Sequence, residues 1–567
     1  MKKSITQLCR WRVRAVLCLL VLAVFLAGTG CDQFWINSAD DIASKIIRHR
    51  QKQTLGTTSD ADIGAEDGRV GSRGDMYSFT PSRVDSKVPD SFRRPARNEI
   101  EDEAISTNGF GDAIPFRLSD ALEYAFHNAW DFQTQKEDLY LSALALMTER
   151  QLWTPQFVAG VRGEYANYGQ VRDFDHAMTA VSELSVTQRL PYGGEVAARV
   201  VNVLMRDIGR HTTSGESGTA ILEANIPLLR GAGKVAYESR FQAERNLVYA
   251  VRDFEAARRD LVVDVAGDFF DLLAIKTQIE SAEAARESAM LEQDRTQAWV
   301  DTGRLVQIEA KRIDVQVLDR SNDVNNARVR YETALDRFKI RIGMPTQEHI
   351  DVVDEELDLF EPDVTEHQAV ETAIAYRLDL INTMDRIDDA KRGVVIAKNN
   401  FLPQFDISGS ITTNTDPNKK NSLSYNTERT LWQGMVELEV PLDRREERNV
   451  FRAALIDLRR GERAYELAKS NVILDVRSAI RNLQLAKQSM AIQEENIEVN
   501  EERAAQANEL LKRGRLSSSR DTIEAQNAIQ ASKNQYAAAV ADYRLAILTL
   551  QRSCGTLRVD DQGHWTR

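Results

Sequence analysis

The sequence predicts an α+β protein in which a helix, a group of amphipathic strands and a long helical hairpin occur twice. Three observations support this prediction: a coiled-coil stripe near the C-terminus, alternating residues after two matched prolines, and two hairpin turns of the same sequence. The chain has 567 residues, of which only 7% are aromatic, and a formal net charge of −13. This composition is typical of long helices and gives no basic surface for nucleic acid.

The clearest helical pattern lies between Asp443 and Leu557. On its first limb, apolar residues recur in alternating steps of four and three at Val472, Val476, Ala479, Leu483, Ala486 and Met490. This spacing predicts a coiled-coil seam. A helix from Arg444 to Leu511 would be about 100 Å long at about 1.5 Å per residue. Such a helix has to pack beside similar helices, because a compact globule cannot contain it.

The same order of elements occurs earlier in the chain. One helix opens at Leu118 and ends at Pro155-Gln156-Phe157, and another opens at Ala369 and ends at Pro403-Gln404-Phe405. After each proline, apolar and polar residues alternate, which predicts strands with one apolar and one polar face. We expect four strands in the first copy and two in the second, each set followed by a long helical hairpin.

The turns of the two hairpins share a sequence, because Gly303-Arg304-Leu305 recurs 211 residues later as Gly514-Arg515-Leu516. A repeat of this size with matched breaks indicates a duplicated structural unit. The predicted divisions are a signal peptide (1–30), a polar, disordered tether (31–115), a first repeat with four strands (116–345), a linker (346–365), a second repeat with two strands (366–557) and a C-terminal tail (558–567).

The N-terminus has the pattern of an export signal. Basic residues between Lys2 and Arg14 precede an apolar run from Ala15 to Leu26, and Gly28-Thr29-Gly30-Cys31 follows. This is the order of a secretory signal peptide, and a cysteine directly after small residues resembles the bacterial lipobox. We expect Cys31 to become the first residue of the mature chain and to carry diacylglycerol and palmitate. The alternative is an ordinary signal peptide that is cut nearby.

The sequence shows no grouping of residues that would support catalysis or bind a metal ion. Cys9 and Cys18 leave with the signal, so only Cys31 and Cys554 remain and a disulfide framework is excluded. The sequence contains no cysteine and histidine cluster at metal spacing, no nucleophile with a base and no phosphate-binding loop. We therefore expect neither an enzyme nor a metal site, and no cofactor besides the lipid on Cys31.

After the signal, no apolar run is long enough to cross a bilayer as a helix. If the mature chain crosses one, its strands have to do so as a closed barrel, because only closure pairs every backbone group in lipid. Six strands are fewer than the roughly eight that a single-chain barrel needs. The barrel would therefore be shared between chains.

Together these features resemble the TolC family of outer-membrane efflux channels over residues 116–557. The resemblance rests on the duplicated order of elements, on Leu190-Pro191-Tyr192-Gly193-Gly194 and on the two Gly-Arg-Leu turns. It implies a homotrimer whose strands share one β-barrel among the lipids of the outer membrane. The implied fold is an α+β membrane protein in which a long antiparallel coiled-coil barrel, a tunnel through the periplasm, continues from this transmembrane β-barrel.

The resemblance also implies passive conduction in a tripartite efflux or type I secretion system, with a periplasmic adaptor and an inner-membrane pump as partners. The hairpin turns would be the periplasmic tips, where the aperture opens and the adaptor docks. The corresponding residues are Thr302, Gly303, Arg304, Leu305, Gly514, Arg515, Leu516 and Ser517. Glu309 and Asp521 are candidate gate charges; the alternative for each is a solvated residue at a helix start, where acidic side chains are favoured.

Two questions stay open at this point. The usual barrel of the family takes four strands from each subunit, so the extra hairpin around Tyr192 to Asp207 either enlarges the barrel or forms an external loop. The runner-up function is a structural lipoprotein, a coiled-coil spacer tethered to one membrane without a pore. Asp32, which resembles an inner-membrane retention signal, and the long tether favour the spacer, whereas the amphipathic strands oppose it.

Overall fold

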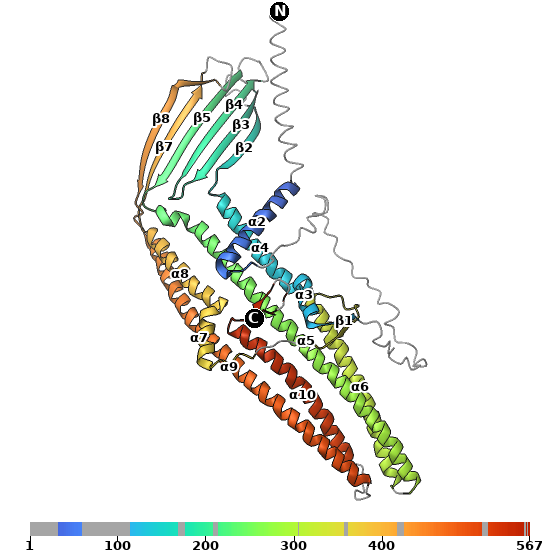
Figure 1. Ribbon diagram of the computed structural model, residues 1–567. Helices are drawn as coiled ribbons and strands as arrows, with labels where there is room; N and C mark the ends of the chain where they lie inside the picture. Colours follow the sequence, from blue (N-terminus) through green and yellow to red (C-terminus); the bar gives the residue numbers. More distant parts are fainter. Residues whose placement is uncertain are drawn as a thin grey trace, which may run out of the picture.

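The computed structural model describes residues 32–58, 114–167, 176–207, 214–303, 305–355, 361–416, 424–512, 520–560, 563 and 565–566. A β-sheet forms one end of the molecule, and long helices extend from it to the opposite end (Figure 1). The predicted combination of amphipathic strands and long helical hairpins is confirmed.

The sheet contains six antiparallel strands in the order β2-β3-β4-β5-β7-β8. They are β2 (Gln156–Asn167), β3 (His176–Arg189), β4 (Glu195–Asp207), β5 (Ser214–Pro227), β7 (Gln404–Thr415) and β8 (Tyr425–Glu439). The pairing of β5 with β7 joins the strands of both repeats into one sheet. Strands β3 and β4 lie between β2 and β5, so the extra hairpin is part of the sheet and is not an external loop. Strands β2 and β8 form the two edges.

The helices occur in two sets of similar length. The first set is α3 (Leu118–Asn128), α4 (Trp130–Gln151), α5 (Glu238–Asp301) and α6 (Gln307–Ile342), and the second is α7 (Glu366–Tyr376), α8 (Leu378–Asn399), α9 (Arg445–Lys512) and α10 (Arg520–Ser553). Helices α3 and α7 have 11 residues each, and α4 and α8 have 22 each. None of the described helices combines the length and apolar composition needed to span a membrane.

The helix predicted to open each repeat is broken near its start. A single extended residue, Ala129 or Arg377, separates the short helix from the longer one. A glycine with positive φ at the end of each hairpin, Gly343 or Gly555, packs against the backbone of this break. A Cβ at position 343 would lie 2.0 Å from the carbonyl oxygen of Asn128. Each repeat is therefore closed by the same kind of glycine contact. The sequence pattern did not predict this contact.

The coiled-coil seam of α9 is buried as its periodicity predicts. Val472, Val476, Ala479, Leu483 and Ala486 belong to one buried cluster with residues of α7, α8 and α10, whereas Met490 is half-buried. A larger apolar cluster fills the first repeat and includes Phe254, Phe269, Phe270, Tyr331 and Phe338. This larger cluster also includes Ala541 and Leu548 of α10, so α10 contributes to both cores and joins the two hairpins.

The expectation of a disordered tether from residue 31 to 115 is wrong for its first part, which forms helix α2 (Asp32–Leu55). This helix packs on α4 and α5 through the buried side chains of Ala43 and Ile47, and Arg50 pairs with Glu244 of α5 at 2.8 Å. The polar composition concealed a narrow apolar stripe with a spacing of four residues, which suffices for a helix that packs on others. Residues 59–113 of the predicted tether lie outside the described residues.

Short elements complete the fold. Strand β1 (Ile114–Phe116) pairs in parallel with β6 (Ile350–Val352), which lies in the predicted linker. A 3-10 helix, η3 (Gly233–Tyr237), leads from the sheet into α5. Strands β9 (Arg558–Val559) and β10 (Trp565–Thr566) pair in the predicted C-terminal tail.

Charged side chains connect α5 of the first repeat with α8 of the second. Arg252 Nη1 lies 2.6 Å from Asp385 Oδ2. The hydroxyl of Tyr249 donates a hydrogen bond of 2.5 Å to Asp389, which also pairs with Arg245. Burial, aided by Asp389, raises the pKa of Tyr249 to about 12. Burial also acts to raise the pKa of Asp389, but hydrogen bonds led by that of Tyr249 outweigh it, and the pKa lies below its ordinary value.

The variant Gly343→Ala is expected to lower the free energy of unfolding by about 2 kcal/mol or more, because the alanine needs a positive φ and its Cβ meets a backbone oxygen. Thermal unfolding followed by circular dichroism measures the change. The control is Gly461→Ala inside α9, where a Cβ meets nothing within 4 Å and alanine favours the helix. Equal melting temperatures for the two variants would contradict the role of Gly343.

The variant Asp389→Asn removes the charge beside Arg245 and Tyr249. Because folding lowers the pKa of Asp389, its ionisation stabilises the fold above the ordinary pKa, and this stability is lost as the pH falls through the folded value. We expect a deficit of about 1 kcal/mol at neutral pH, reduced by partial exposure to solvent, that disappears in acid. Urea unfolding at several pH values tests this, with Asp388→Asn, whose partner Lys391 is an exposed lysine, as control. A deficit that does not change with pH would contradict it.

Candidate channel and tip surfaces

The strand register divides the side chains of the sheet between an apolar and a polar face. Residues paired across neighbouring strands point to the same face. The pairs Leu222 with Ile411 and Ile411 with Trp432 therefore share one face. The next residues along the strands, paired as Glu223 with Ser410, share the other face. The alternation predicted for β7 and β8 extends to the other strands with exceptions, because Val158, Leu431 and Met435 are apolar side chains on the polar face.

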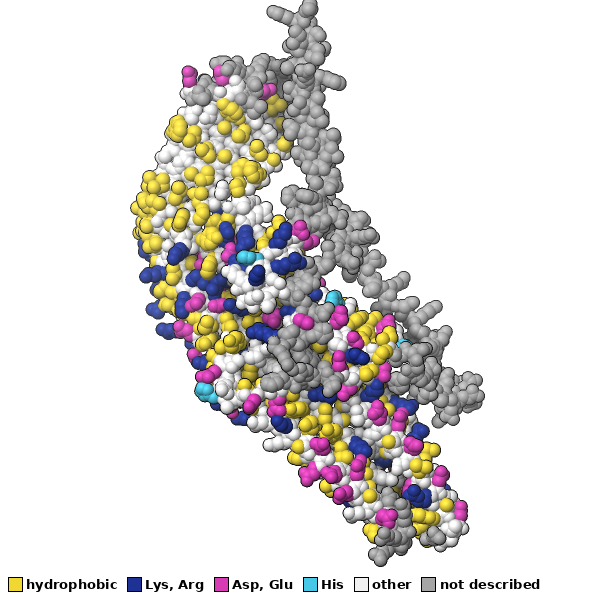
Figure 2. Space-filling model, viewed as in Figure 1, with side chains coloured by type: hydrophobic (Ala, Val, Ile, Leu, Met, Phe, Trp, Pro, Cys, Tyr) yellow, Lys and Arg dark blue, Asp and Glu magenta, His cyan; other side chains and the backbone are white. Residues whose placement is uncertain are grey.

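The apolar face presents large exposed side chains on every strand. They are Phe157, Val161, Tyr165, Met178, Leu184, Leu204, Leu222, Ile226, Ile407, Trp432, Val436 and Leu438. Figure 2 shows apolar side chains gathered over the sheet, whereas charged side chains cover the helices below it. An apolar surface of this extent marks an interaction with lipid or with another protein.

The polar face contains charged side chains that pair across strands. Arg199 on β4 lies between Glu183 on β3, at 3.2 Å, and Glu223 on β5, at 3.7 Å. Glu437 and Glu439 on β8 share this face, as the sequence predicts. The sequence did not reveal the triad around Arg199, because its members meet only through the register of three strands. The charged side chains on this face need contact with water, because burying them in an apolar environment costs free energy.

The first hairpin turn is closed by local hydrogen bonds. Thr302 ends α5, and its hydroxyl donates a bond of 3.1 Å to a carbonyl one turn earlier. Gly303 follows with φ +73°, and the amide of Leu305 donates 3.3 Å back to the last turn of α5. Val306 and Ile308 expose apolar side chains directly beside this turn. The far ends of both hairpins lie at the end of the molecule away from the sheet (Figure 1).

Several of the predicted site residues cannot be placed. Arg304, the lipidation residue Cys31 and the second turn with Gly514, Arg515, Leu516 and Ser517 lie outside the described residues. The backbone of Asp521 belongs to the first turn of α10, and its side chain is not described. The roles assigned to these residues stay predictions.

Glu309 lies in the first turn of α6 and points into the hairpin. Its side chain is 6% exposed and forms a 2.6 Å ion pair with Arg312, whose side chain is 55% exposed. Arg312 therefore presents the charge of this pair to the surroundings. Glu309 is also not a solvated residue at a helix start, because only 6% of its side chain is exposed.

Behind the first tip, polar side chains occupy positions of the hairpin seam. Glu292, Thr296 and Gln316 are buried, and Thr296 Oγ1 and Gln316 Oε1 have no hydrogen-bond partner among the described residues. Unpaired buried polar atoms weaken packing, so this part of the seam is less tightly held than the apolar part near the sheet. The sequence signal is the step from Ala289 through Glu292 to Thr296, which continues the seam with polar residues.

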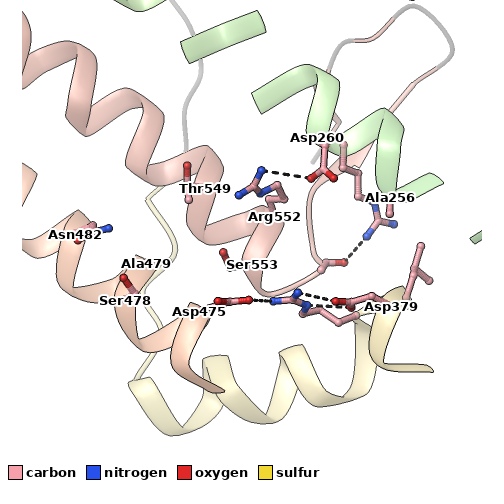
Figure 3. Close-up of a pocket in the computed structure, with 14 residues that line it drawn as sticks. Ala256, Asp260, Asp379, Asp475, Ser478, Ala479, Asn482, Thr549, Arg552 and Ser553 are labelled. Carbon is pink, nitrogen blue, oxygen red and sulfur yellow. Dashed lines mark hydrogen bonds and ion pairs between the residues drawn. The ribbon is translucent and has the colours of Figure 1, made fainter. Parts of the chain in front are cut away.

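A cavity of about 470 Å³ lies beside the helix break at Arg377 (Figure 3). The guanidinium of Arg377 lies between Asp379, at 2.7 Å, and Asp475, at 2.8 Å, and Arg552 pairs with Asp260 of α5 at 3.4 Å. Burial acts to raise the pKa of Asp379, but the hydrogen bond from Arg377 outweighs it and the pKa is lowered. These charges pair with one another and connect α5, α8, α9 and α10.

The chemistry of the described residues does not indicate a catalytic centre. Among them, no group of three or more His, Cys, Asp or Glu side chains is arranged to hold a metal ion. Cys554 is buried, and burial raises the pKa of its thiol, which keeps it protonated and unreactive.

Comparison with known proteins gives one family and one fold. Residues 369–556 match the family described as outer membrane efflux protein. Among solved structures, the chain is similar to the Campylobacter jejuni CmeC outer membrane channel, with a TM-score of 0.58 and 14% identity over 77% of this chain and 85% of that one. It is also similar to the Neisseria gonorrhoeae MtrE outer membrane channel, with a TM-score of 0.58 and 15% identity over 78% and 90%.

The outer membrane protein VceC from Vibrio cholerae gives a TM-score of 0.57 and 12% identity over 77% of this chain and 96% of that one. A search of curated protein sequences found no match. At these identities the structures establish the fold alone, and the family match covers the second repeat. The second repeat is thus similar to outer membrane efflux proteins, and the chain as a whole has the fold of the solved outer membrane channels.

Proposed function

We propose that this chain is the outer-membrane channel subunit of a tripartite efflux or type I secretion system and conducts its cargo passively. One observation carries the proposal: a single sheet has an exposed apolar face and a charged opposite face, and it continues into two long helical hairpins. In a membrane barrel the apolar face meets lipid and the polar face lines the lumen. The structural spacer of the alternative has no use for such a sheet.

Three copies complete the channel in this proposal. An open sheet edge in lipid leaves backbone groups unpaired at several kcal/mol each, so the edges have to meet those of other copies. With six strands per chain, three copies form a barrel of about 18 strands, a size that leaves an aqueous channel. The hairpin of β3 and β4 then enlarges the barrel.

The N-terminus adds a lipid anchor in this proposal, with diacylglycerol and palmitate on Cys31. Support comes from α2, which begins at Asp32 and packs on α4 and α5. In Figure 1 the start of α2 lies level with the end of the sheet that is nearer the helices. A lipid there would enter the leaflet that the apolar face reaches. The intact mass of the mature chain tests the anchor, and an unmodified N-terminus would contradict it.

The hairpin ends form the periplasmic aperture in this proposal and dock an adaptor that leads to an inner-membrane pump. The exposed side chains of Val306, Ile308 and Arg312 beside the first turn give an adaptor both apolar and charged contacts. The polar seam at Glu292 and Thr296 supports movement at this end, because separating it exposes polar groups to water at little cost.

Lysine on the apolar face tests the membrane sheet. Ile407→Lys combined with Leu438→Lys is expected to abolish recovery of the trimer from separated outer membranes, because each lysine costs about 2–4 kcal/mol at the bilayer midplane. The control is Ser408→Lys with Glu437→Lys, one residue away on the polar face, which should assemble normally. If the apolar-face variant assembles as well as this control, the channel is excluded and the structural lipoprotein becomes the better description.

Cross-linking at the tips tests the gate. Cysteines replacing Val306 and Leu510, both exposed near the hairpin ends, are expected to form disulfides between hairpins without changing trimer yield. Ion conductance of the purified trimer in planar bilayers should then lack large openings until a reductant is added. Large openings that persist in fully cross-linked channels would show that the hairpin ends are not the gate.

A further inference from the structure

Three arginines from three helices meet around one carboxylate where the helices approach the sheet. They are Arg50 of α2, Arg150 in the last turn of α4 and Arg240 in the first turn of α5. Arg50 lies 2.8 Å from Oε2 of Glu244, whereas Arg150 and Arg240 lie 3.2 and 3.8 Å from Oε1. These three arginines, here called the arginine cluster, share a single negative partner.

The arginine cluster keeps N–H donors that have no acceptor. At 3.8 Å, the contact of Arg240 with Glu244 is an ion pair and is too long for a hydrogen bond. The Nε atoms of Arg150 and Arg240 are shielded from solvent, and neither has a hydrogen-bond partner among the described residues. Buried donors are nearly always paired in proteins. An acceptor from outside the chain would therefore complete this arrangement.

The carboxylates that neighbour the cluster along the chain are engaged elsewhere. Glu149 accepts a hydrogen bond of 2.5 Å from the hydroxyl of Ser239, and Glu238 pairs with Arg392 of α8 at 2.8 Å. The exposed side of α2 adds further charged residues, which are mostly basic: Asp41, Lys45, Arg48 and Lys52. The surroundings therefore favour an acceptor that is negatively charged.

Aromatic side chains adjoin the cluster on its side toward the sheet. The ring of Tyr237 lies 5.1 Å from that of Trp153, and the guanidinium of Arg240 lies 5.1 Å from the centre of the Tyr237 ring. Trp153 follows the end of α4 and precedes β2. Its Nε1 is buried and finds no acceptor in the part of the chain that the structure describes. Tryptophan and tyrosine are favoured at the level of lipid headgroups, because one end of each side chain is apolar and the other is polar.

The arginine cluster lies just below the apolar face of the sheet. Arg150 precedes the first residue of β2, Gln156, by six positions, and Arg240 follows η3, which leads from the sheet into α5. Figure 2 shows Lys and Arg side chains gathered below the apolar side chains of the sheet on the same face of the molecule, where α2 crosses α4 and α5 in Figure 1. Because the apolar face contacts acyl chains in the proposed function, the cluster then lies at the level of the headgroups.

A phosphate diester has the chemistry that this site lacks. It is anionic, and its oxygen atoms accept paired hydrogen bonds from the planar fork of a guanidinium. Basic pockets between membrane-proximal helices are typical binding sites for anionic headgroups. Inorganic phosphate offers similar oxygen atoms, but only a lipid also brings acyl chains to the apolar face above the cluster.

We propose that Arg150, Arg240 and Trp153 bind the phosphate diester of an anionic phospholipid from the periplasmic leaflet of the outer membrane. Arg50 and Glu244 are positioning residues, because they hold the two guanidinium groups together. The bound headgroup then fixes the ends of α4 and α5 at the membrane surface. The proposal rests on the proposed function for the position of the membrane, whereas the unpaired donors are a property of the chain itself.

Removing both guanidinium groups tests the headgroup site. In the detergent-extracted full-length protein, Arg150→Gln combined with Arg240→Gln is expected to lower the affinity for phosphatidylglycerol at least about fivefold, because charge-assisted hydrogen bonds are lost. Native mass spectrometry at increasing lipid concentrations measures the affinity. The control is Arg328→Gln with Arg341→Gln, which removes two arginines of α6 that pair with carboxylates of α5. This control should bind the lipid as the wild type does, and equal affinity of the cluster variant and the wild type would overturn the proposal.

The wild type alone distinguishes the two sources of phosphate, whether or not the variant folds. Phosphatidylglycerol is expected to raise the melting temperature by at least about 3 °C, and inorganic phosphate at the same concentration by less than about 1 °C, because only a ligand that binds the folded state stabilises it. Inorganic phosphate that acts as strongly as the lipid would overturn the lipid site. A protein that is recovered from the outer membrane but fails these tests leaves the channel intact. Recovery from the inner membrane alone would instead overturn the proposed function.

Discussion

The unpaired edges of the sheet, β2 and β8, are the constraint on which the rest of the structure depends. A sheet with an apolar face enters lipid only when every backbone group is paired, so one chain cannot complete its membrane part alone. The triad of Arg199 with Glu183 and Glu223 on the opposite face needs water, which a closed barrel encloses. The helices then have to hold successive copies so that their edges meet.

Duplication gives both repeats the same closing contact and joins their strands in one sheet. Inside the chain, β5 pairs with β7 directly above the ion pairs between α5 and α8, and Gly343 and Gly555 close both repeats against the same kind of helix break. The contact between α5 and α8 is charged, whereas Trp130 of α4 and Leu467 of α9 are exposed apolar side chains.

The hairpins change character from one end to the other. Near the sheet, aromatic side chains such as Phe254 and Phe269 fill the core of the first repeat. Near the tip, the seam contains Glu292, Thr296 and Glu309 instead. Near the sheet, apolar burial holds the helices firmly together, because apolar contacts that are lost there cannot be replaced by contacts with water. Polar groups at the other end can exchange their partners for water, which suits the aperture proposed there.

The sequence by itself determined the long helices, the six strands and the two faces of the sheet, because each depends on residues close together along the chain. It did not reveal the breaks at Ala129 and Arg377, since neither residue breaks a helix and the packing of Gly343 and Gly555 from distant parts of the chain accompanies each break. It also missed the docking of α2 and the burial of Glu309, and it left open whether the hairpin that contains β4 joins the sheet. Only the tertiary structure decided these features, because strand order and burial depend on which distant segments meet.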